Sequence, residues 1–159
     1  KVESTSLRRQ ELNDSVECKT LYKFSDVYSP IHPLSGFSTT ESWGRWSNAR
    51  KSNFGFNTAA CLPRTITLEL SAYVNEKHRS QDAIVSLNGH EITEITVNHG
   101  DKRPIILHLE LPKKYINLSS LNVISFKYSN SASPSSLGLS TDDRLLSFGF
   151  ISAYFDEDE

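Results

Sequence analysis

A strict alternation of apolar and polar residues along two separate segments is the feature that most constrains the fold. Residues 64–74 read RTITLELSAYV, so that apolar side chains occupy every second position from Ile66 to Leu70, and residues 105–111 read IILHLEL. Successive side chains of a β-strand point to opposite faces, so a period of two places one apolar set on one face of a sheet. The pattern therefore predicts half-buried strands.

The turns between these segments indicate how the strands are connected. Asn88-Gly89 predicts a tight hairpin, because a type I′ turn needs positive φ at both central residues. Proline, glycine and serine predict loops at 29–37 and 130–143. The remaining strands are expected at 20–24, 53–58, 83–93 on both sides of the hairpin turn, 91–98, 121–129 and 144–155. About eight short strands without a long helix predict an all-β fold, an antiparallel β-sandwich of the jelly-roll type.

The length of 159 residues fits one domain with a single core. Residues 1–35 are expected to be a lead-in segment or linker with a short strand, 36–155 the sandwich, and 156–159 an acidic tail. The side chains expected to be largely buried are Leu68, Leu70, Ile84, Leu87, Leu107, Leu109, Phe126 and Phe148.

Charge and hydropathy exclude two classes of partner. The net charge is −2 without a basic block, so no nucleic-acid partner is expected. No apolar run approaches the about 20 residues that span a bilayer. The chain starts at Lys1 and contains no methionine, and we therefore expect a fragment or a processed product of a longer protein.

Catalytic and metal-binding motifs are not found. The five histidines never show the H-E-x-x-H spacing of zinc proteases, and no G-x-S-x-G motif places a nucleophile after a strand. The sequence thus predicts no catalytic residue, no metal site and no cofactor in this fragment. A small hydrolase with an unconventional site is the least favoured alternative.

The two cysteines, Cys18 and Cys61, leave two interpretations open. They are either two buried thiols or one disulfide that ties the N-terminal segment to the domain. A disulfide would need an oxidising compartment.

The two tryptophans stand three residues apart in ESWGRWSN, residues 41–48. In an extended chain this spacing points Trp43 and Trp46 to opposite faces. We therefore expect one in the core and the other near a surface that also carries Arg45, where stacking and hydrogen bonds could bind a sugar. The alternative is that both are buried at a sandwich edge, and Gly44 could bend the chain and realign them.

A second cluster lies where the last strand begins. Asp142 and Arg144 are two residues apart, so both side chains can point to one side. A guanidinium and a carboxylate there could hold a polar ligand, or they could fasten the long loop onto the strand.

Two motifs in this order resemble a known family. GFSTTESWGRWS (36–47) and SPSSLGLSTDDRLLSFGF (133–150) are similar to the soluble C-terminal β-sandwich domain attached to some bacterial membrane-embedded glycosyltransferases, which modify surface polysaccharide such as the O-antigen of lipopolysaccharide. The resemblance covers roughly 36–155, and Asp142 rather than Asp143 matches its S-x-D-x-R register.

The resemblance implies a non-catalytic periplasmic domain of a membrane glycosyltransferase, which supports or presents glycan. Its partners would be the membrane-embedded part of the same polypeptide and a polysaccharide or lipid-linked sugar. The reaction would belong to the membrane part, so no catalytic residue is carried over. The alternative from the residues themselves is a secreted interaction or adhesion module that binds protein.

Overall fold

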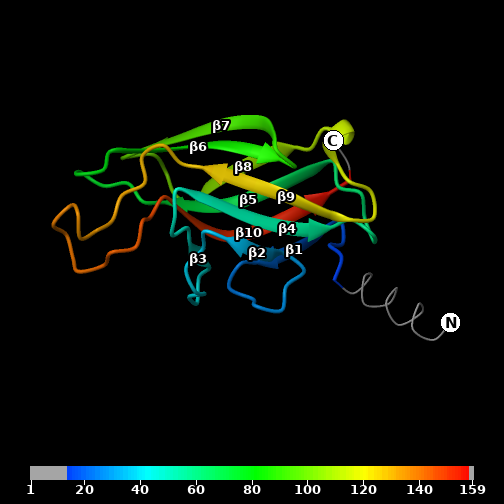
Figure 1. Ribbon diagram of the computed structural model, residues 1–159, viewed down its shortest axis with the longest axis horizontal. Coiled ribbons are helices and arrows are strands. Elements are labelled where there is room, and N and C mark those ends of the chain that lie inside the picture. Colours follow the sequence, from blue (N-terminus) through cyan, green and yellow to red (C-terminus); the bar gives the residue numbers. More distant parts are fainter. Residues whose placement is uncertain (1–13, 158–159) are drawn as a thin grey trace.

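The computed structural model describes residues 14–157, which form two antiparallel sheets packed face to face (Figure 1). The first sheet contains β1 (Thr20–Lys23), β10 (Phe148–Asp156), β5 (Thr65–Ala72) and β8 (Ile105–Glu110) in that order, and β3 (Arg45–Trp46) pairs with β10. The second sheet has the order β2 (His32–Ser35), β4 (Lys51–Asn57), β9 (Leu121–Lys127), β6 (Ser80–Leu87) and β7 (His90–Asn98). A single 3₁₀ turn, η1 (Lys113–Tyr115), is the only helical element among the described residues. The predicted all-β jelly-roll-like sandwich is confirmed.

The core between the sheets is dominated by aromatic rings. Fully buried phenylalanines come from both sheets: Phe54, Phe56, Phe126, Phe148, Phe150 and Phe155. Phe150 lies at the centre, with ring centroids 5.0 Å from Phe126, 5.1 Å from Phe37 and 5.4 Å from Phe24. Through Phe150, β10 of the first sheet therefore contacts the second sheet and the connections on either side of β2.

Most of the predicted core residues are buried: Leu68, Leu70, Leu87, Leu109, Phe126 and Phe148. Leu107 is half-buried, because β8 is an edge strand of its sheet. The prediction for Ile84 is wrong, since its side chain is 38% exposed. Ile84 and Leu87 are three apart in one strand and therefore face opposite sides, and Leu87 is the one that points inward.

The Asn88-Gly89 hairpin is confirmed, with φ of 50° and 85° at the two central residues. It joins β6 to β7 as expected for a type I′ turn. The segment expected to be a loop at 29–37 contains β2, which was not predicted because Pro33 cannot donate to a ladder. Proline is tolerated there because β2 is an edge strand, paired only with β4.

The N-terminal segment is integrated into the sandwich. Its described part, 14–35, supplies one edge strand to each sheet, β1 and β2. Residues 1–13 of the expected lead-in, and 158–159 of the acidic tail, lie outside the described residues. Over the described part, no helix has the length and apolar character needed to cross a bilayer.

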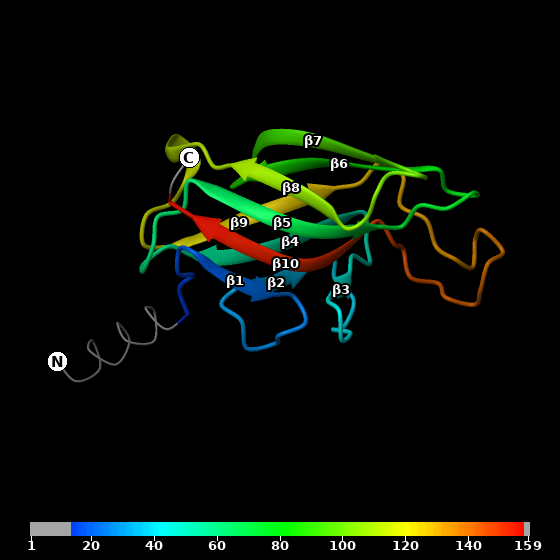
Figure 2. The same cartoon turned by 180° about the vertical axis from the view of Figure 1, so that it is seen from behind.

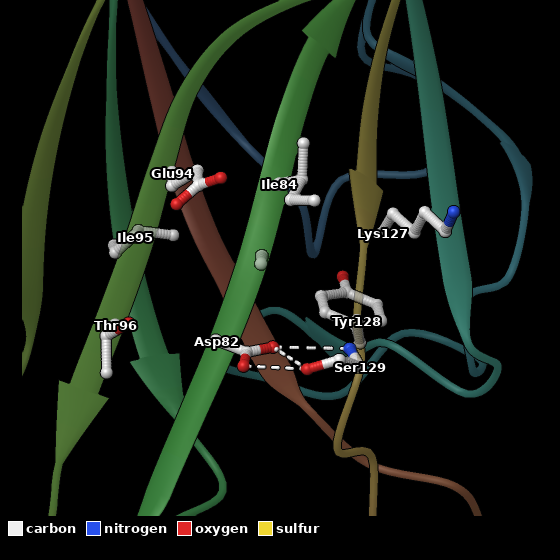
Figure 3. Close-up of a pocket in the computed structure, with 9 residues that line it drawn as sticks. Asp82, Ile84, Glu94, Ile95, Thr96, Lys127, Tyr128 and Ser129 are labelled. Atoms are coloured by element: carbon white, nitrogen blue, oxygen red, sulfur yellow. Dashed lines mark hydrogen bonds between the residues drawn. The ribbon is translucent and has the colours of Figure 1, made fainter.

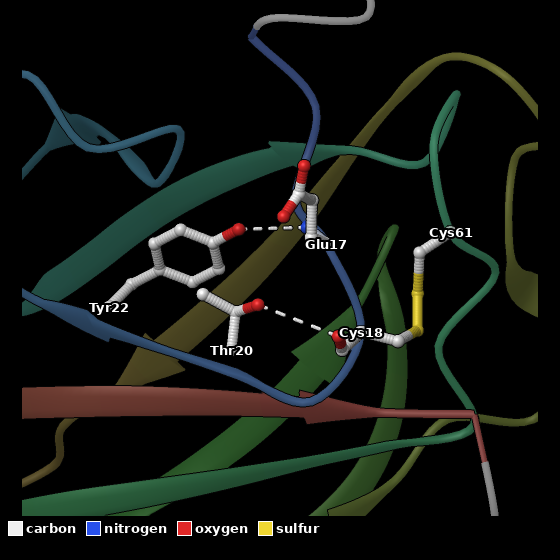
Figure 4. Close-up of a disulfide and its surroundings, with 5 residues drawn as sticks. All are labelled: Glu17, Cys18, Thr20, Tyr22 and Cys61. Carbon is white, nitrogen blue, oxygen red and sulfur yellow. Dashed lines mark hydrogen bonds between the residues drawn. A yellow bond between two sulfur atoms is a disulfide. The ribbon is translucent and has the colours of Figure 1, made fainter.

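A disulfide joins Cys18 to Cys61, with their Cα atoms 5.7 Å apart (Figure 4). It links the residues just before β1 to the connection between β4 and β5. Beside it, the backbone amide of Glu17 donates to the Tyr22 hydroxyl at 2.8 Å. Of the two interpretations of the cysteines, the structure has the bonded pair.

Candidate functional site

A tight turn at the start of β3 sets the positions of the two tryptophans. The backbone of Glu41 and Gly44 forms two hydrogen bonds, of 2.7 and 3.2 Å, that close this turn. Gly44 has a φ of +153°, and a Cβ atom there would lie 2.2 Å from the carbonyl oxygen of Phe150. Only glycine fits this close approach of two backbones.

The prediction that Trp43 and Trp46 face opposite sides is wrong. Both are half-buried, and their rings contact each other edge to face, with centroids 5.3 Å apart. The turn at Gly44 removes the extended geometry on which the prediction depended. Neither tryptophan belongs to the phenylalanine core.

The Trp43 ring packs against a second glycine, Gly149. Trp46 pairs with Gly149 of β10, and Gly149 pairs in turn with Ser71 of β5. A Cβ atom on Gly149 would lie 2.8 and 2.9 Å from two ring atoms of Trp43. The Trp43 ring therefore packs over bare backbone, on the outer face of the first sheet.

Two further rings extend this pair. The Tyr73 ring is 6.2 Å from Trp46, edge to face, and the His78 ring is 5.9 Å from Tyr73, nearly parallel to it. All four side chains are half-buried. We call Trp43, Trp46, Tyr73 and His78 the aromatic strip.

The predicted partners Asp142 and Arg144 form a forked ion pair. Arg144 Nε is 3.1 Å from both carboxylate oxygens, and Nη2 is 2.8 Å from Oδ2. These hydrogen bonds hold the pKa of the Asp142 carboxyl below its usual range and raise the pKa of Arg144. Glu41 lies 4.0 Å from Arg144 Nη1 and adds to the same cluster.

Ser38 joins the two sequence motifs. Its hydroxyl oxygen accepts a hydrogen bond from Arg144 Nη1 at 3.1 Å, and its carbonyl oxygen accepts one from Arg45 Nε at 3.0 Å. Arg45 also lies over the Phe37 ring, 5.8 Å from its centroid, and partial burial lowers its pKa. Arg45 pairs with Phe150 and faces inward, whereas the neighbouring Trp46 faces outward. Arg45 is therefore a structural contact and not part of the aromatic strip.

The long loop before β10 and the connection between β5 and β6 project from the same end of the sandwich (Figure 2), and hydrogen bonds link the loops around the strip. Lys77 Nζ donates to the Leu137 carbonyl at 3.0 Å, and the Leu145 amide donates to Asn48 Oδ1 at 3.0 Å. His78 Nε2 is 3.0 Å from the side chain of the buried Gln81. The aromatic strip is thus bordered by three loops with fixed contacts.

Sequence reasoning missed Tyr73, His78, Ser38 and Glu41 as members of this region. Tyr73 had a usable signal, because it continues the outward-facing phase of β5 immediately beside Ala72. The other three come together only through tertiary contacts. Across residues 14–157 no group of three or more His, Cys, Asp or Glu side chains is placed to hold a metal ion.

The Asp142–Arg144 pair makes this end of the molecule sensitive to acid. Because the folded pKa of Asp142 is lowered, its contribution to stability is complete above the unfolded value of about 3.9 and is lost as the pH falls through the folded value. A carboxyl-carbon NMR titration of Asp142 should give a midpoint below about 3.9. In Arg144→Met the midpoint should rise toward the ordinary value. Equal midpoints in the two proteins would contradict this role of Arg144.

Comparisons with known proteins fit the architecture. A family model described as "Domain of unknown function (DUF7024)" matches residues 11–153. No curated protein matches the sequence. A carbohydrate-binding module of family CBM36, solved with calcium and xylotriose, superposes with a TM-score of 0.50 at 10% identity, over 86% of this chain and 99% of that chain. The likeness shows a shared β-sandwich fold.

Two other solved structures align less well. A family 35 carbohydrate-binding module from Clostridium thermocellum has a TM-score of 0.38 at 10% identity, over 85% of this chain and 96% of that chain. The catalytic domain of a GH87 α-1,3-glucanase, solved with nigerose, has a TM-score of 0.45 at 8% identity, over 92% of this chain and 30% of that chain.

Proposed function

The chain belongs to the DUF7024 family of domains of unknown function, and we propose that it is a non-catalytic domain that binds glycan at the aromatic strip. The observation that carries the proposal is the run of four contacting, half-buried rings on the outer face of the first sheet. Aromatic rings that are partly exposed can pack against the C–H faces of sugars, and polar groups beside them hydrogen-bond the hydroxyls.

Polar groups on and beside the segment that carries Trp43 are suited to such a ligand. Glu41 stands two residues before Trp43, lies 4.0 Å from Arg144 Nη1, and its side chain is 42% exposed. Arg144 itself is 32% exposed and held in one geometry by Asp142. Such fixed donors and acceptors cost little conformational entropy on binding. The CBM36 structure, which has the same fold, was solved with a bound xylotriose.

We further propose that the domain works on the periplasmic side of the bacterial inner membrane. It would belong to a longer polypeptide whose membrane-embedded part transfers sugars to surface polysaccharide of the O-antigen type, and it would present that glycan. The similarity of the motifs at 36–47 and 133–150 supports this context. The Cys18–Cys61 disulfide supports an oxidising compartment.

One observation favours a second candidate, a protein-interaction or adhesion module. The loop between β1 and β2 exposes two neighbouring apolar side chains, Val27 at 66% and Tyr28 at 92%. Exposed apolar side chains at a loop tip are common at protein interfaces. These residues lie in a different loop from the aromatic strip, so the two functions can be tested separately.

The decisive experiment titrates O-antigen polysaccharide fragments and xylo-oligosaccharides into three proteins by calorimetry. These are the wild type, Trp43→Ala and, as a matched control, Tyr28→Ala. We expect Trp43→Ala to weaken glycan binding about tenfold or more, because an aromatic stacking partner is lost, while Tyr28→Ala binds as the wild type does.

The stability of Trp43→Ala is measured alongside, and Trp43→Phe keeps the seat over Gly149 filled if the alanine variant unfolds. Partial retention of binding in Trp43→Phe supports the stacking role. A folded Trp43→Ala protein with unchanged affinity would overturn the assignment of the site. Loss of binding in Tyr28→Ala alone would instead favour the β1–β2 loop.

A further inference from the structure

A pocket of about 240 Å³ lies on the second sheet, over β6, β7 and β9 (Figure 3). Ile84 stands in its middle, between Glu94 of β7 and Lys127 of β9. It is the isoleucine that the sequence predicts to be buried and that the structure leaves 38% exposed. Ile84 is an exposed apolar side chain with a charged residue on the neighbouring strand on each side.

The strand register places opposite charges on the two sides of Ile84. Ile84 pairs directly with Glu94 and with Lys127. Two strand spacings separate the backbones of the two charged residues, about 10 Å. Neither charged side chain takes part in an ion pair or hydrogen bond with another described residue. Both are therefore available to a ligand that rests on Ile84.

The carboxylate of Asp82 also lines the pocket, and hydrogen bonds to Ser129 hold it in place. Asp82 accepts hydrogen bonds from the Ser129 hydroxyl, at 2.6 Å to Oδ1 and 2.7 Å to Oδ2, and from the Ser129 amide at 3.2 Å. Thr96 pairs with Asp82 across the β6–β7 ladder. An ionised carboxylate has about four acceptor positions, so Asp82 keeps capacity for donors from a ligand.

We propose that this pocket binds a single neutral pyranose unit. Ile84 would contact the apolar C–H face of the ring, Asp82 and Glu94 would accept hydrogen bonds from hydroxyls, and Lys127 would donate to a sugar oxygen. The volume is below the roughly 300–1,000 Å³ of pockets for drug-sized ligands, which fits one sugar unit. Two carboxylates against one ammonium disfavour an acidic sugar.

The pocket is separate from the aromatic strip. The strip lies on the outer face of the first sheet, and the pocket lies on the outer face of the second. The class of ligand rests on the proposed function, whereas the position of the pocket does not. A domain with both sites could hold two points on one polysaccharide, or two chains, and would gain avidity without further contacts.

The test is an NMR titration of ¹⁵N-labelled protein with methyl α-D-glucopyranoside and methyl α-D-galactopyranoside, up to about 50 mM, which detects a Kd in the millimolar range. We expect saturable shifts of the backbone amides of Ile84, Thr96 and Lys127. The indole N–H signals of the only two tryptophans report on the aromatic strip in the same spectra. The two sites are thus observed independently.

Two variants and one control complete the experiment. Glu94→Gln and Ile84→Ser should each raise the Kd that is fitted to the shifts at the pocket about tenfold. Glu91→Gln changes the same charge on the same exposed strand outside the pocket lining, and should leave the shifts unchanged.

The outcomes separate the two sites. Pocket shifts without indole shifts would support the pocket and count against the strip. Indole shifts without pocket shifts would overturn the pocket alone. Pocket shifts that survive both variants would also overturn it.

Discussion

Replacing Phe150 by alanine should lower the free energy of unfolding by about 4 kcal/mol. Phe150 is fully buried, and four other phenylalanine rings pack around it: Phe24, Phe37, Phe54 and Phe126. Phe54 and Phe126 come from the second sheet, opposite Phe150 of the first, and Phe24 and Phe37 come from the connections before β2 and β3. A cavity there would be lined from several directions by rigid rings, so the site can collapse only in part.

The measurement is urea unfolding followed by tryptophan fluorescence, with Tyr28→Ala as the control. Tyr28 is 92% exposed, so its truncation should change the free energy of unfolding by no more than about 0.5 kcal/mol. A loss below about 1 kcal/mol in Phe150→Ala would mean that the two sheets are not coupled through this cluster.

Removing the disulfide should have a comparable effect. The bond closes a loop with a sequence separation of 43 residues. The chain-entropy model gives about 4 kcal/mol for a loop of this length, because the open chain gains conformational freedom when unfolded. The double variant Cys18→Ser, Cys61→Ser should lose this amount in urea unfolding.

Reduction of the wild type with dithiothreitol provides the matched comparison, because it opens the same bond without a substitution. The reduced wild type and the double variant should unfold at the same urea concentration. A double variant as stable as the oxidised wild type would show that the 18–61 link adds nothing to the stability of the sandwich.

Local patterns were sufficient to predict the class of fold. The alternation from Ile66 to Leu70 and the Asn88-Gly89 turn each depend on neighbours in the sequence, and both have the expected geometry. The pattern failed in β6, where Ile84 and Leu87 cannot both point inward. Period alone does not say which phase of a strand faces the core when both phases contain an apolar residue.

The candidate site was predicted only in its parts. The sequence singled out Trp43, Arg45, Trp46, Asp142 and Arg144, but the arrangement that it predicted for the two tryptophans was wrong. Their arrangement depends on contacts between distant segments, such as the Trp43 ring over Gly149 and the Arg144 side chain at Ser38. A spacing rule cannot include such contacts, because they exist only after β3 has paired with β10.

The Cys18–Cys61 bond also determines how the domain responds to mechanical load. β1 is an edge strand, and a pull on the chain from its N-terminal side would otherwise peel its hydrogen bonds from β10 one at a time. Because Cys18 precedes β1, tension arriving from that side enters the covalent link first and passes to the connection between β4 and β5. In the oxidised protein the hydrogen bonds between β1 and β10 therefore do not bear this force, which is transmitted through the disulfide to the interior strands.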